Sequence, residues 1–577
     1  EYMVQNSLGR IYLDNTPQSR LALQWKYLIT PAEGNSPEQH RLEIKDAEEL
    51  TCIDAACGSG HILVEAFDLL YGIYEEQYAS PREACEAIFT HHLVGSALDP
   101  RAKQLAMFAL LMKACSYVPE MSDCRVMPRV FDMPDPLRKE VMEELHDSLP
   151  HFFLGATEQV VKETIEALNV LQHAPELGSI MQLNLSASTR YAIEQALERP
   201  DSKLFPYAPQ LHLLLALTRK YAAVVMNPPY MGSKNMNPDL AKYVKKHYPE
   251  GKADLFATFM LISKDMLIEN GKYAMINMQS WMFLSSYENL REKIINEVQI
   301  ESMLHLGPRT FDELGGEITQ NVAFVISHHA PSLNGMYYRL VEGKSCTSKA
   351  QMFLDAQQLD GIYYPNISQQ EFSKIPGSPI AYWVSEKIRE TFTKNLSLSA
   401  VCKPTQGLAT ADNDRFLRAW FEVDFHYIGL DLDNAINASQ SKKKWFPCNK
   451  GGELRKWYGN QLEVIDWEND GKRIKSFAGA VIRNEETYYK ETIGWNMVSS
   501  KGIAFRYYPK GFILNNASCS YPCDNLVGAL GLLNSKFISV IADIINPTIN
   551  LSNGVVGKFP YMVIEKDEYN LLVQQNI

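Results

Sequence analysis

There is no CxxC pair among the ten cysteines of this 577-residue sequence, and Cys519 and Cys523 are the closest late pair. Zinc ribbons are built from such pairs, so the spacing argues against one and favours reduced thiols without a metal. The chain contains no run of 18 uninterrupted apolar residues, and it does not open with a signal peptide. These absences predict an intracellular protein with no metal site and no membrane segment.

Basic residues are outnumbered, because 56 Lys and Arg stand against 68 Asp and Glu, which gives a formal net charge of −12. This balance argues against a protein that binds nucleic acids indiscriminately. It leaves room for specific binding, because phosphates need only a local basic face. The distribution of the cations therefore carries more information than their sum.

The chain is too long for one hydrophobic core, so we expect two or three domains. Because Glu1-Tyr2-Met3-Val4 reads as the middle of a helix, we also expect further sequence upstream. The first 345 residues alternate between strand and helix patterns. The expected elements are strands over 51–56, 93–98, 222–226, 273–278, 302–306 and 321–327, helices over 62–78, 101–115, 254–270 and 288–298, a mostly helical insert over about 120–220, and a polar loop over 232–251.

The order strand, glycine turn, helix, strand is the first half of a doubly wound α/β sheet. It predicts an α/β domain over residues 1–345. Residues 346–400 read as a connector, and residues 401–577 as a mixed α+β domain with short strands and aromatic-rich loops.

The strand over 222–226 stops at Asn227-Pro228-Pro229-Tyr230. Consecutive prolines cannot continue a sheet ladder, and the residue before a proline is held extended. The motif is therefore expected at the carboxyl end of a strand, where open α/β sheets bind ligands. Its oxygens can accept hydrogen bonds from an amino group while the tyrosine stacks on the ring that bears it. A plain Asn-Pro turn is the alternative, and the tetrapeptide alone does not decide between them.

The turn Cys57-Gly58-Ser59-Gly60 follows the strand over 51–56 and precedes a helix. Its glycines allow a tight turn and the close approach of a ligand to the backbone. Asp54, at the end of the strand, can accept a hydrogen bond from a positively charged amino group. His61 stands where a phosphate-binding loop has lysine, so the turn is not a P-loop, and a helix-capping turn is the alternative.

Asp99 ends the next strand, where nucleoside cofactors commonly meet an acid that binds their ribose hydroxyls. Asp99 is equally well placed to be the N-cap of the following helix, which has Pro100 at its first position. The residues alone leave both interpretations open.

Taken together, these segments resemble the class I S-adenosylmethionine-dependent DNA adenine methyltransferases, and most closely the PglX (BrxX) family of the BREX phage-defence systems. The resemblance extends over essentially the whole chain. It is carried by residues 54–63, 227–230, 252–256, 406–418, 445–460 and 495–513. It implies a Rossmann-like methyltransferase domain followed by a target-recognition domain for DNA.

The resemblance also implies a reaction, the transfer of a methyl group from S-adenosylmethionine to the exocyclic amine of an adenine flipped out of duplex DNA. It assigns catalysis to Asn227, Pro228, Pro229 and Tyr230: the Asn227 side chain and the Pro228 carbonyl accept the amine protons, and Tyr230 stacks on the base. The residues that it assigns to the cofactor are Asp54, Ala55, Cys57, Gly58, Gly60, Leu98 and Asp99.

The sequence departs from the family pattern at two positions. Ala55 replaces the usual proline, with little expected effect. Ala97 stands two residues before Asp99, where these enzymes often carry a ribose-binding acid. The loss of one charge-assisted hydrogen bond costs about 1.5–3 kcal/mol, so we expect weaker cofactor binding unless Asp99 substitutes.

In the C-terminal domain, cations are interleaved with aromatic residues, which is typical of a DNA-reading surface. The candidate DNA contacts are Asn413, Arg415, Arg418, Lys442, Lys443, Lys444, Arg455, Lys456, Lys501 and Arg506. A solvated charged face is the alternative for each of them. It is also the alternative for the lysines of the loop over 232–251, which could contact phosphates or close over the base.

The expected partners are double-stranded DNA, other BREX proteins and phage-encoded DNA-mimic inhibitors, and the expected location is the bacterial cytoplasm, at the nucleoid. Three alternatives stay open. The chain could be the methyltransferase and specificity part of a single-chain restriction–modification enzyme. It could be a DNA-recognition module with weak or lost methylation, because Ala97 stands where these enzymes often have a ribose-binding acid. Methylation of RNA or of a protein glutamine is less favoured, because the C-terminal domain resembles DNA readers.

Overall fold

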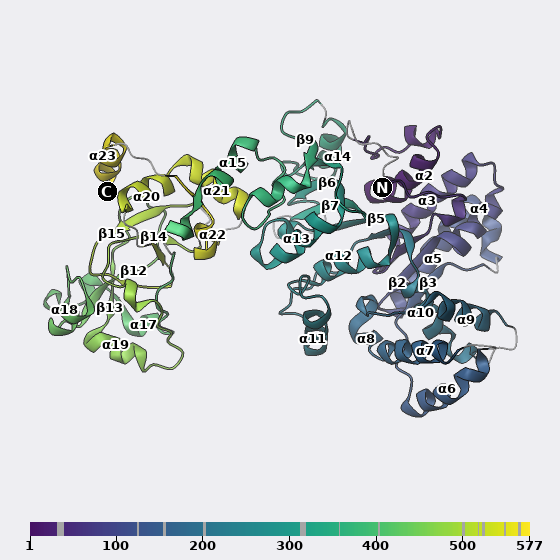
Figure 1. Ribbon diagram of the computed structural model, residues 1–577, viewed down its shortest axis with the longest axis horizontal. Coiled ribbons are helices and arrows are strands. Elements are labelled where there is room, and N and C mark those ends of the chain that lie inside the picture. The colour runs from purple at the N-terminus through teal and green to yellow at the C-terminus, as the bar shows by residue number, and fades with distance from the viewer. Residues whose placement is uncertain are drawn as a thin grey trace. The chain divides into compact units, whose positions relative to one another are not determined.

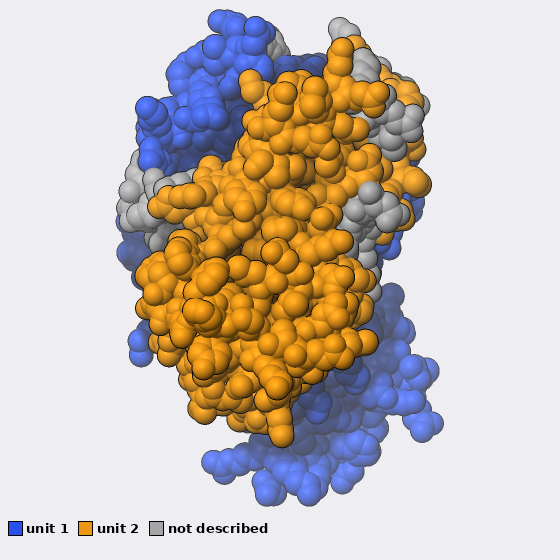
Figure 2. Space-filling view, turned by 90° about the vertical axis from the view of Figure 1, so that its left-hand side faces the viewer, with its two compact units in different colours: residues 1–370 blue, residues 371–577 orange. Residues whose placement is uncertain are grey.

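The computed structural model describes the chain apart from residues 32–39, 124–125, 154–156, 200–203, 312–318, 357, 402–403, 499–501, 517, 522–524, 547–549 and 563–566. The chain forms two compact units, Glu1–Gln370 and Glu371–Ile577 (Figures 1 and 2). The first unit ends later than the expected residue 345, because β8 (Asn334–Arg339) pairs with β9 (Tyr363–Ser368) at the edge of its sheet. Residues 346–370 therefore belong to the first unit and not to a connector.

A nine-stranded sheet forms the centre of the first unit, in the order β3-β2-β1-β4-β5-β7-β6-β8-β9. The remaining strands are β1 (Cys52–Asp54), β2 (Leu93–Ala97), β3 (Arg129–Asp132), β4 (Tyr221–Met226), β5 (Leu267–Met278), β6 (Gln299–Gly307) and β7 (Asn321–Ser327). The strands from β3 to β5 in this order are parallel, whereas β7 is antiparallel to both β5 and β6. Between β1 and β4 the strand order changes direction, and such a switch point opens a ligand-binding crevice at the carboxyl ends of the strands.

The helices that accompany this sheet are α1 (Tyr2–Val4), α2 (Arg10–Asn15), α3 (His61–Glu76), α4 (Pro81–Ala87), α5 (Pro100–Tyr117), α11 (Pro238–His247), α12 (Leu255–Met266), α13 (Glu288–Glu297) and α14 (Cys346–Leu354). All six residues of β4 are buried. A strand covered on both faces reads as a continuous apolar run without alternation, which explains the sequence pattern before Asn227.

The insert is shorter than expected, because residues 129–132 form β3 and join the sheet beside β2. A strand of four residues is too short to show a periodicity, so the pattern of helices around it concealed it. The insert proper consists of α6 (Lys139–Phe152), α7 (Glu158–Leu171), α8 (Ala174–Leu177), α9 (Ala187–Glu198) and α10 (Ala208–Thr218), which group together (Figure 1).

The polar loop expected over 232–251 contains a helix, α11, so that prediction was wrong. The Asn237 side chain caps the helix by accepting a hydrogen bond from the Leu240 N–H at 2.8 Å. Pro238 occupies the first turn, and Leu240 and Val244 are buried. The abundance of lysine and asparagine concealed these start signals and the apolar pair four residues apart.

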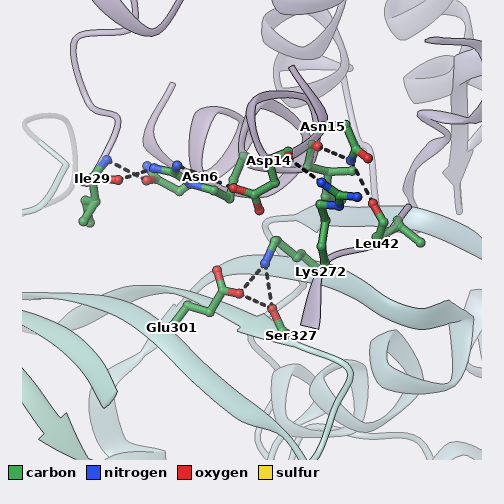
Figure 3. A network of polar contacts seen from close by, with 11 residues as sticks. Asn6, Asp14, Asn15, Ile29, Leu42, Lys272, Glu301 and Ser327 are labelled. Carbon is green, nitrogen blue, oxygen red and sulfur yellow. Dashed lines mark hydrogen bonds and ion pairs between the residues drawn. The ribbon is translucent and has the colours of Figure 1, made fainter. Parts of the chain in front are cut away.

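Two groups of polar contacts lie in the N-terminal segment and on the sheet (Figure 3). On the sheet side, Lys272 forms an ion pair with Glu301 and donates to Ser327 Oγ at 2.9 Å. Burial by itself would raise the pKa of Glu301, but the Lys272 ammonium outweighs it and holds this pKa below its usual range. On the N-terminal side, Asn6 Oδ1 accepts from the Ile29 N–H at 2.8 Å. The Lys272 group joins β5, β6 and β7. Tyr2 Oη, which lies 2.8 Å from Ser302 Oγ, attaches the N-terminal segment to β6.

The second unit contains a four-stranded sheet, β11-β13-β12-β16, a three-stranded sheet, β15-β14-β17, and the pair β10-β18. Its strands are β10 (Leu396–Ser397), β11 (Leu417–Ala419), β12 (Trp445–Asn449), β13 (Glu463–Asp466), β14 (Thr492–Asn496), β15 (Phe505–Tyr508), β16 (Ile513–Leu514), β17 (Ser518–Tyr521) and β18 (Pro560–Tyr561). Its helices are α15 (Glu386–Lys394), α16 (Leu398–Val401), α17 (Asn413–Phe416), α18 (Ala435–Gln440), α19 (Glu468–Lys475), α20 (Leu526–Leu533), α21 (Lys536–Ile545), α22 (Asn553–Gly557) and α23 (Asp567–Asn576).

The described residues of this unit include a hydrophobic cluster that contains Trp495 and another that contains Trp467. Within the described part of the chain, no single helix is long and apolar enough to cross a membrane. Only α20 and α21 taken together, with a bend of 67° between them, meet that criterion of length and composition.

Candidate active site

Two loops leave adjacent strands at the switch point of the sheet. One follows β1 and contains the glycine turn, and the other follows β4 and contains Asn227-Pro228-Pro229-Tyr230. β1 and β4 are parallel, with Ile53 opposite Val224, so both loops emerge at the same edge. The structure therefore brings together the two segments that the sequence marked as cofactor-binding and catalytic.

The glycine turn is shaped by positive φ angles, 52° at Gly58 and 84° at Gly60. A Cβ at Gly60 would lie 2.9 Å from the Ala106 Cβ of α5, so this position requires glycine for packing as well as for backbone conformation. A Cβ at Gly58 would meet no atom within 4 Å. Open space above Gly58 is what a ligand that approaches the backbone needs.

Asp54 is buried at the start of this loop, and its Oδ1 accepts a hydrogen bond from the Ala56 N–H at 3.0 Å. Burial raises the pKa of Asp54 to about 7, and the Ala56 hydrogen bond offsets only part of this rise. A nearby positive charge would restore the ionised form. The site thus suits a ligand with a cationic group.

The backbone of the loop is held from two sides. Ser179, which follows α8 of the insert, donates to the Ala55 carbonyl at 2.5 Å. The Cys57 N–H donates to the Ser96 carbonyl of β2 at 2.9 Å. Burial raises the pKa of the Cys57 thiol, so this cysteine is an unreactive packing residue. These contacts hold the loop in one conformation before any ligand binds.

Leu98 and Asp99 follow β2 at the same edge. The Leu98 side chain is 61% exposed, which is unusual for a leucine beside a buried strand. Asp99 is the N-cap of α5, and its Oδ1 accepts from the Arg101 N–H at 2.7 Å. The capping interpretation of Asp99 is therefore confirmed, and its role toward a ribose stays a prediction.

Asp132 is a residue of this edge that the sequence did not single out. It ends β3 and lies directly opposite Ala97 in the register of β2 and β3. Its carboxylate accepts from Lys103 Nζ at 2.8 Å. A carboxylate is thus present one strand away from the missing acid at position 97. The signal was the apolar pair before it, Val130-Phe131, which ends in an acid as the strand before Asp99 does.

The tetrapeptide Asn227-Pro228-Pro229-Tyr230 follows the buried strand β4 directly. Asn227, Pro229 and Tyr230 are exposed, and Pro228 is buried. The Tyr230 hydroxyl lies 3.3 Å from Asn227 Oδ1 and 3.1 Å from the Ile276 carbonyl. Burial of the hydroxyl raises the pKa of Tyr230 to about 12, so the phenol stays protonated at neutral pH.

Asp254 fixes the loop behind Tyr230. Its Oδ1 accepts from the Met231 N–H at 2.9 Å, and the Leu255 N–H donates to the Met231 carbonyl at 3.0 Å. Phe256 packs edge-on against the Tyr230 ring, with 6.1 Å between ring centroids. The segment over 252–256 therefore supports the tetrapeptide, and the outer face of the tyrosine ring is left available.

One predicted DNA contact is contradicted by the structure. Arg506 is completely buried in the second unit, where it donates to Asn496 Oδ1 at 2.7 Å and to Tyr508 Oη at 3.3 Å. Its guanidinium holds β14 and β15 together and is not available to a nucleic acid. Sequence pattern failed here because an arginine within a short aromatic strand looks the same whether it is a core residue or a surface one.

The other predicted DNA contacts are at the surface, except Lys501, which lies outside the described residues. Arg415 is exposed and packs over the Phe477 ring at 5.0 Å, and Lys444 lies 5.1 Å over the Trp445 ring. Lys456 Nζ donates to the Asn534 carbonyl at 3.1 Å. The exposed members are Asn413, Arg415, Lys442, Arg455 and Lys456, and the half-buried ones are Arg418, Lys443 and Lys444. Among the described residues no group of His, Cys, Asp and Glu side chains is arranged to hold a metal ion.

A family of known methylases matches part of the first unit. Residues 91–311 match the model of the Eco57I restriction-modification methylase family. The solved Type IIL restriction-modification enzyme MmeI, in complex with DNA, aligns with a TM-score of 0.50 over 99% of this chain and 68% of its own, at 13% sequence identity. The fold is thus that of the α/β methylases of restriction-modification systems, as expected.

Two curated relatives are more specific. The chain is 35% identical to the adenine-specific methyltransferase BrxX of Escherichia coli O9:H4 (strain HS), over 97% of its own length and 48% of the relative. It is 36% identical to the adenine-specific methyltransferase PglX of Lacticaseibacillus casei (strain Zhang), over 97% of its own length and 49% of the relative. The chain is therefore a homologue of the BrxX and PglX adenine-specific methyltransferases, and it spans about half the length of these relatives.

Proposed function

We propose that this chain is the catalytic and DNA-reading part of a site-specific DNA adenine-N6 methyltransferase that uses S-adenosylmethionine. The observation that carries the proposal is the meeting of two loops at one switch point: the glycine turn after β1 and Asn227-Pro228-Pro229-Tyr230 after β4. The homology to BrxX and PglX supports the same reaction and a role in BREX defence, in which methylation marks host DNA.

The cofactor site is proposed to extend along the carboxyl ends of β1, β2 and β3. Asp54 would bind the positively charged amino group of S-adenosylmethionine, because a buried carboxylate gains its charge partner there. The space above Gly58 would admit the cofactor to the backbone of Ala55 and Cys57. Leu98 would contact an apolar face of the cofactor, and Asp99 or Asp132 its polar groups. When bound, the cofactor supplies the methyl group.

In the proposed reaction, Asn227 Oδ1 and the Pro228 carbonyl accept hydrogen bonds from the adenine amine. These bonds would draw electron density toward the nitrogen and orient its lone pair for methyl transfer, and one amine proton would be lost to solvent as the N-methyl group forms. Tyr230 stacks on the flipped base with its available face. Positioning and electrostatics do most of the work in such a site, so no general base with a matched pKa is required before attack.

Duplex DNA is the proposed substrate. Its target base would have to be flipped out of the stack, at a cost of a few kcal/mol. We infer that surface cations of the second unit, such as Arg415 and Lys442, bind phosphates and base edges. Other BREX proteins and phage inhibitors that mimic DNA are proposed partners. The proposed location is the bacterial cytoplasm, at the nucleoid.

The decisive test is Asn227→Ala in the full-length protein. Because the amide contributes to methyl transfer and lies outside the cofactor turn, we expect adenine methylation to be abolished while S-adenosylmethionine binding stays nearly unchanged. Methylation is measured by sequencing modified bases in cells with and without the gene, and binding by calorimetry. Asn235→Ala is the matched control, since Asn235 is exposed in the same loop. Methylation that persists in the Asn227→Ala variant would rule out this assignment.

Ala97 supports a second candidate, a DNA-recognition module with weak or lost methylation. The carboxylate expected at this position is absent, although Asp132 lies opposite it. Calorimetry with S-adenosylmethionine, with and without DNA, separates the two candidates. Binding in either condition favours the enzyme, and no binding in both favours the recognition module.

A further inference from the structure

A chain of hydrogen bonds runs behind the catalytic tetrapeptide and ends at Asn321, the first residue of β7. Asn321 Nδ2 donates to the Tyr230 hydroxyl at 3.3 Å and to the Asn277 carbonyl at 3.4 Å. β7 is antiparallel to β5, with Asn321 opposite Met278, so its first residue lies at the edge where the other strands end. A residue 91 positions away from Tyr230 thus contacts the proposed stacking ring.

The orientation of the Asn321 amide follows from its neighbours. The Asn277 carbonyl can only accept, so the group that faces it must be the amide nitrogen. The same nitrogen then faces the Tyr230 oxygen, which becomes an acceptor. A phenol has one hydrogen, and it can point to Asn227 Oδ1 or to the Ile276 carbonyl, but not to both at once.

The Asn321 side chain is buried at a cost in stability. Its side chain is fully buried, and its Oδ1 has no hydrogen-bond partner among the described atoms. A buried polar atom without a partner destabilises the fold, and an apolar side chain would suit this strand better. What distinguishes Asn321 from the equally buried Asn277 is that its nitrogen donates to the Tyr230 hydroxyl.

We propose that Asn321 is a positioning residue for the methyl transfer, acting through the Tyr230 hydroxyl. Its donated hydrogen bond holds the ring at its stacking angle and directs the hydroxyl hydrogen to the other side. Before the base enters, that hydrogen satisfies Asn227 Oδ1. When the adenine amine donates to Asn227, the hydrogen turns to the Ile276 carbonyl. The Tyr230 hydroxyl and Asn227 Oδ1 thus keep a partner in both states, and no proton is transferred. This inference rests on the proposed function.

The test compares Asn321→Leu with Asn277→Leu in the full-length protein. Both asparagines are fully buried on neighbouring strands, and the Asn277 side chain has no hydrogen-bond partner among the described residues. Leucine nearly preserves the volume, so both variants should fold, and thermal unfolding checks this. The Asn321→Ala and Asn277→Ala pair replaces them if either leucine variant does not fold. The substrate is a duplex that carries the methylated site found by sequencing.

We expect Asn321→Leu to lower kcat about tenfold, the loss of one hydrogen bond in the transition state. S-adenosylmethionine affinity should stay constant, and Asn277→Leu should leave kcat within about twofold of the unmodified protein. An equal loss of kcat in both variants would overturn the inference, because it would indicate a general effect on the edge of the sheet.

A double-mutant cycle with Tyr230→Phe tests the route of the effect. Tyr230→Phe by itself is expected to lower kcat, and adding Asn321→Leu should lower it no further. Losses that simply add would overturn the inference, since Asn321 would then act independently of the hydroxyl. That result in an active enzyme leaves the proposed function intact. Absence of adenine methylation by the unmodified protein would instead remove the proposed function itself.

Discussion

The buried carboxylate of Asp54 makes the stability of the protein depend on pH. It is almost completely buried, and burial raises its pKa to about 7, so near neutral pH about half of the molecules carry the charge. A raised carboxyl pKa favours the folded state at low pH, and this contribution is lost as the pH rises through about 7. The residue therefore costs stability at the pH at which it would bind a cation.

The pH dependence of cofactor binding follows from this pKa. Only the ionised carboxylate attracts the charged amino group of the cofactor, so S-adenosylmethionine affinity should fall about tenfold for each pH unit below about 7. Calorimetry over this range measures the profile. Asp54→Asn should bind more weakly and lose the dependence. A flat profile in the unmodified protein would contradict the role assigned to Asp54.

At the scale of elements, α11 is the feature of the first unit that most needs a function. It follows the proposed catalytic loop, buries Leu240 and Val244, and exposes Lys242, Lys245 and Lys246. Tyr243 and Tyr248, on this segment, bond to the insert: the Tyr243 hydroxyl accepts from the Gln182 N–H at 2.8 Å, and the Tyr248 hydroxyl donates to the Ile180 carbonyl at 2.9 Å. The helix is thus a supported basic surface beside the site.

We expect these lysines to contact DNA phosphates. Replacing all three by glutamine should weaken DNA binding and reduce the salt slope of the logarithm of the affinity by roughly 0.9 per lost phosphate contact. Fluorescence anisotropy at several salt concentrations measures both quantities. Lys139→Gln with Lys162→Gln, on α6 and α7, is the control for nonspecific charge effects. If the triple variant binds like this control, the face of α11 is merely solvated.

At the scale of the whole molecule, the two compact units differ in architecture. The first is organised by one nine-stranded sheet, and the second by small sheets with hydrophobic clusters of their own. A unit with its own core can fold alone. We propose that the first unit performs the chemistry and the second reads DNA. Because the second unit has its own core, it can be studied as an isolated fragment.

We predict that residues 371–577 fold as an isolated fragment. The fragment should unfold in a cooperative thermal transition, followed by circular dichroism. Trp495→Ala should lower its free energy of unfolding by about 3–5 kcal/mol, because Trp495 is fully buried and its indole N–H donates to the Leu551 carbonyl at 2.9 Å. Val498→Ala is the control, since Val498 is exposed. A fragment without a cooperative transition would show that its core depends on the first unit.

Local signals predicted the first unit well. Apolar runs, two glycines and two prolines marked β1, its turn and the end of β4, because each is specified by its own residues. Short or polar elements escaped: β3 has too few residues for a periodicity, and α11 is masked by its lysines. The second unit was predicted only in outline, because its strands are short and gain their stability from contacts distant in sequence.

The sequence by itself determined the doubly wound fold and the two segments of the proposed site, since periodicity, glycine and proline act through neighbouring residues. Only the tertiary structure decided which charged and polar side chains lie beside one another. Asp132 lies opposite Ala97, Asn321 donates a hydrogen bond to Tyr230, and Arg506 is buried. The physical reason is that strand register and burial arise from long-range packing, on which a residue's type and its neighbours in sequence carry little information.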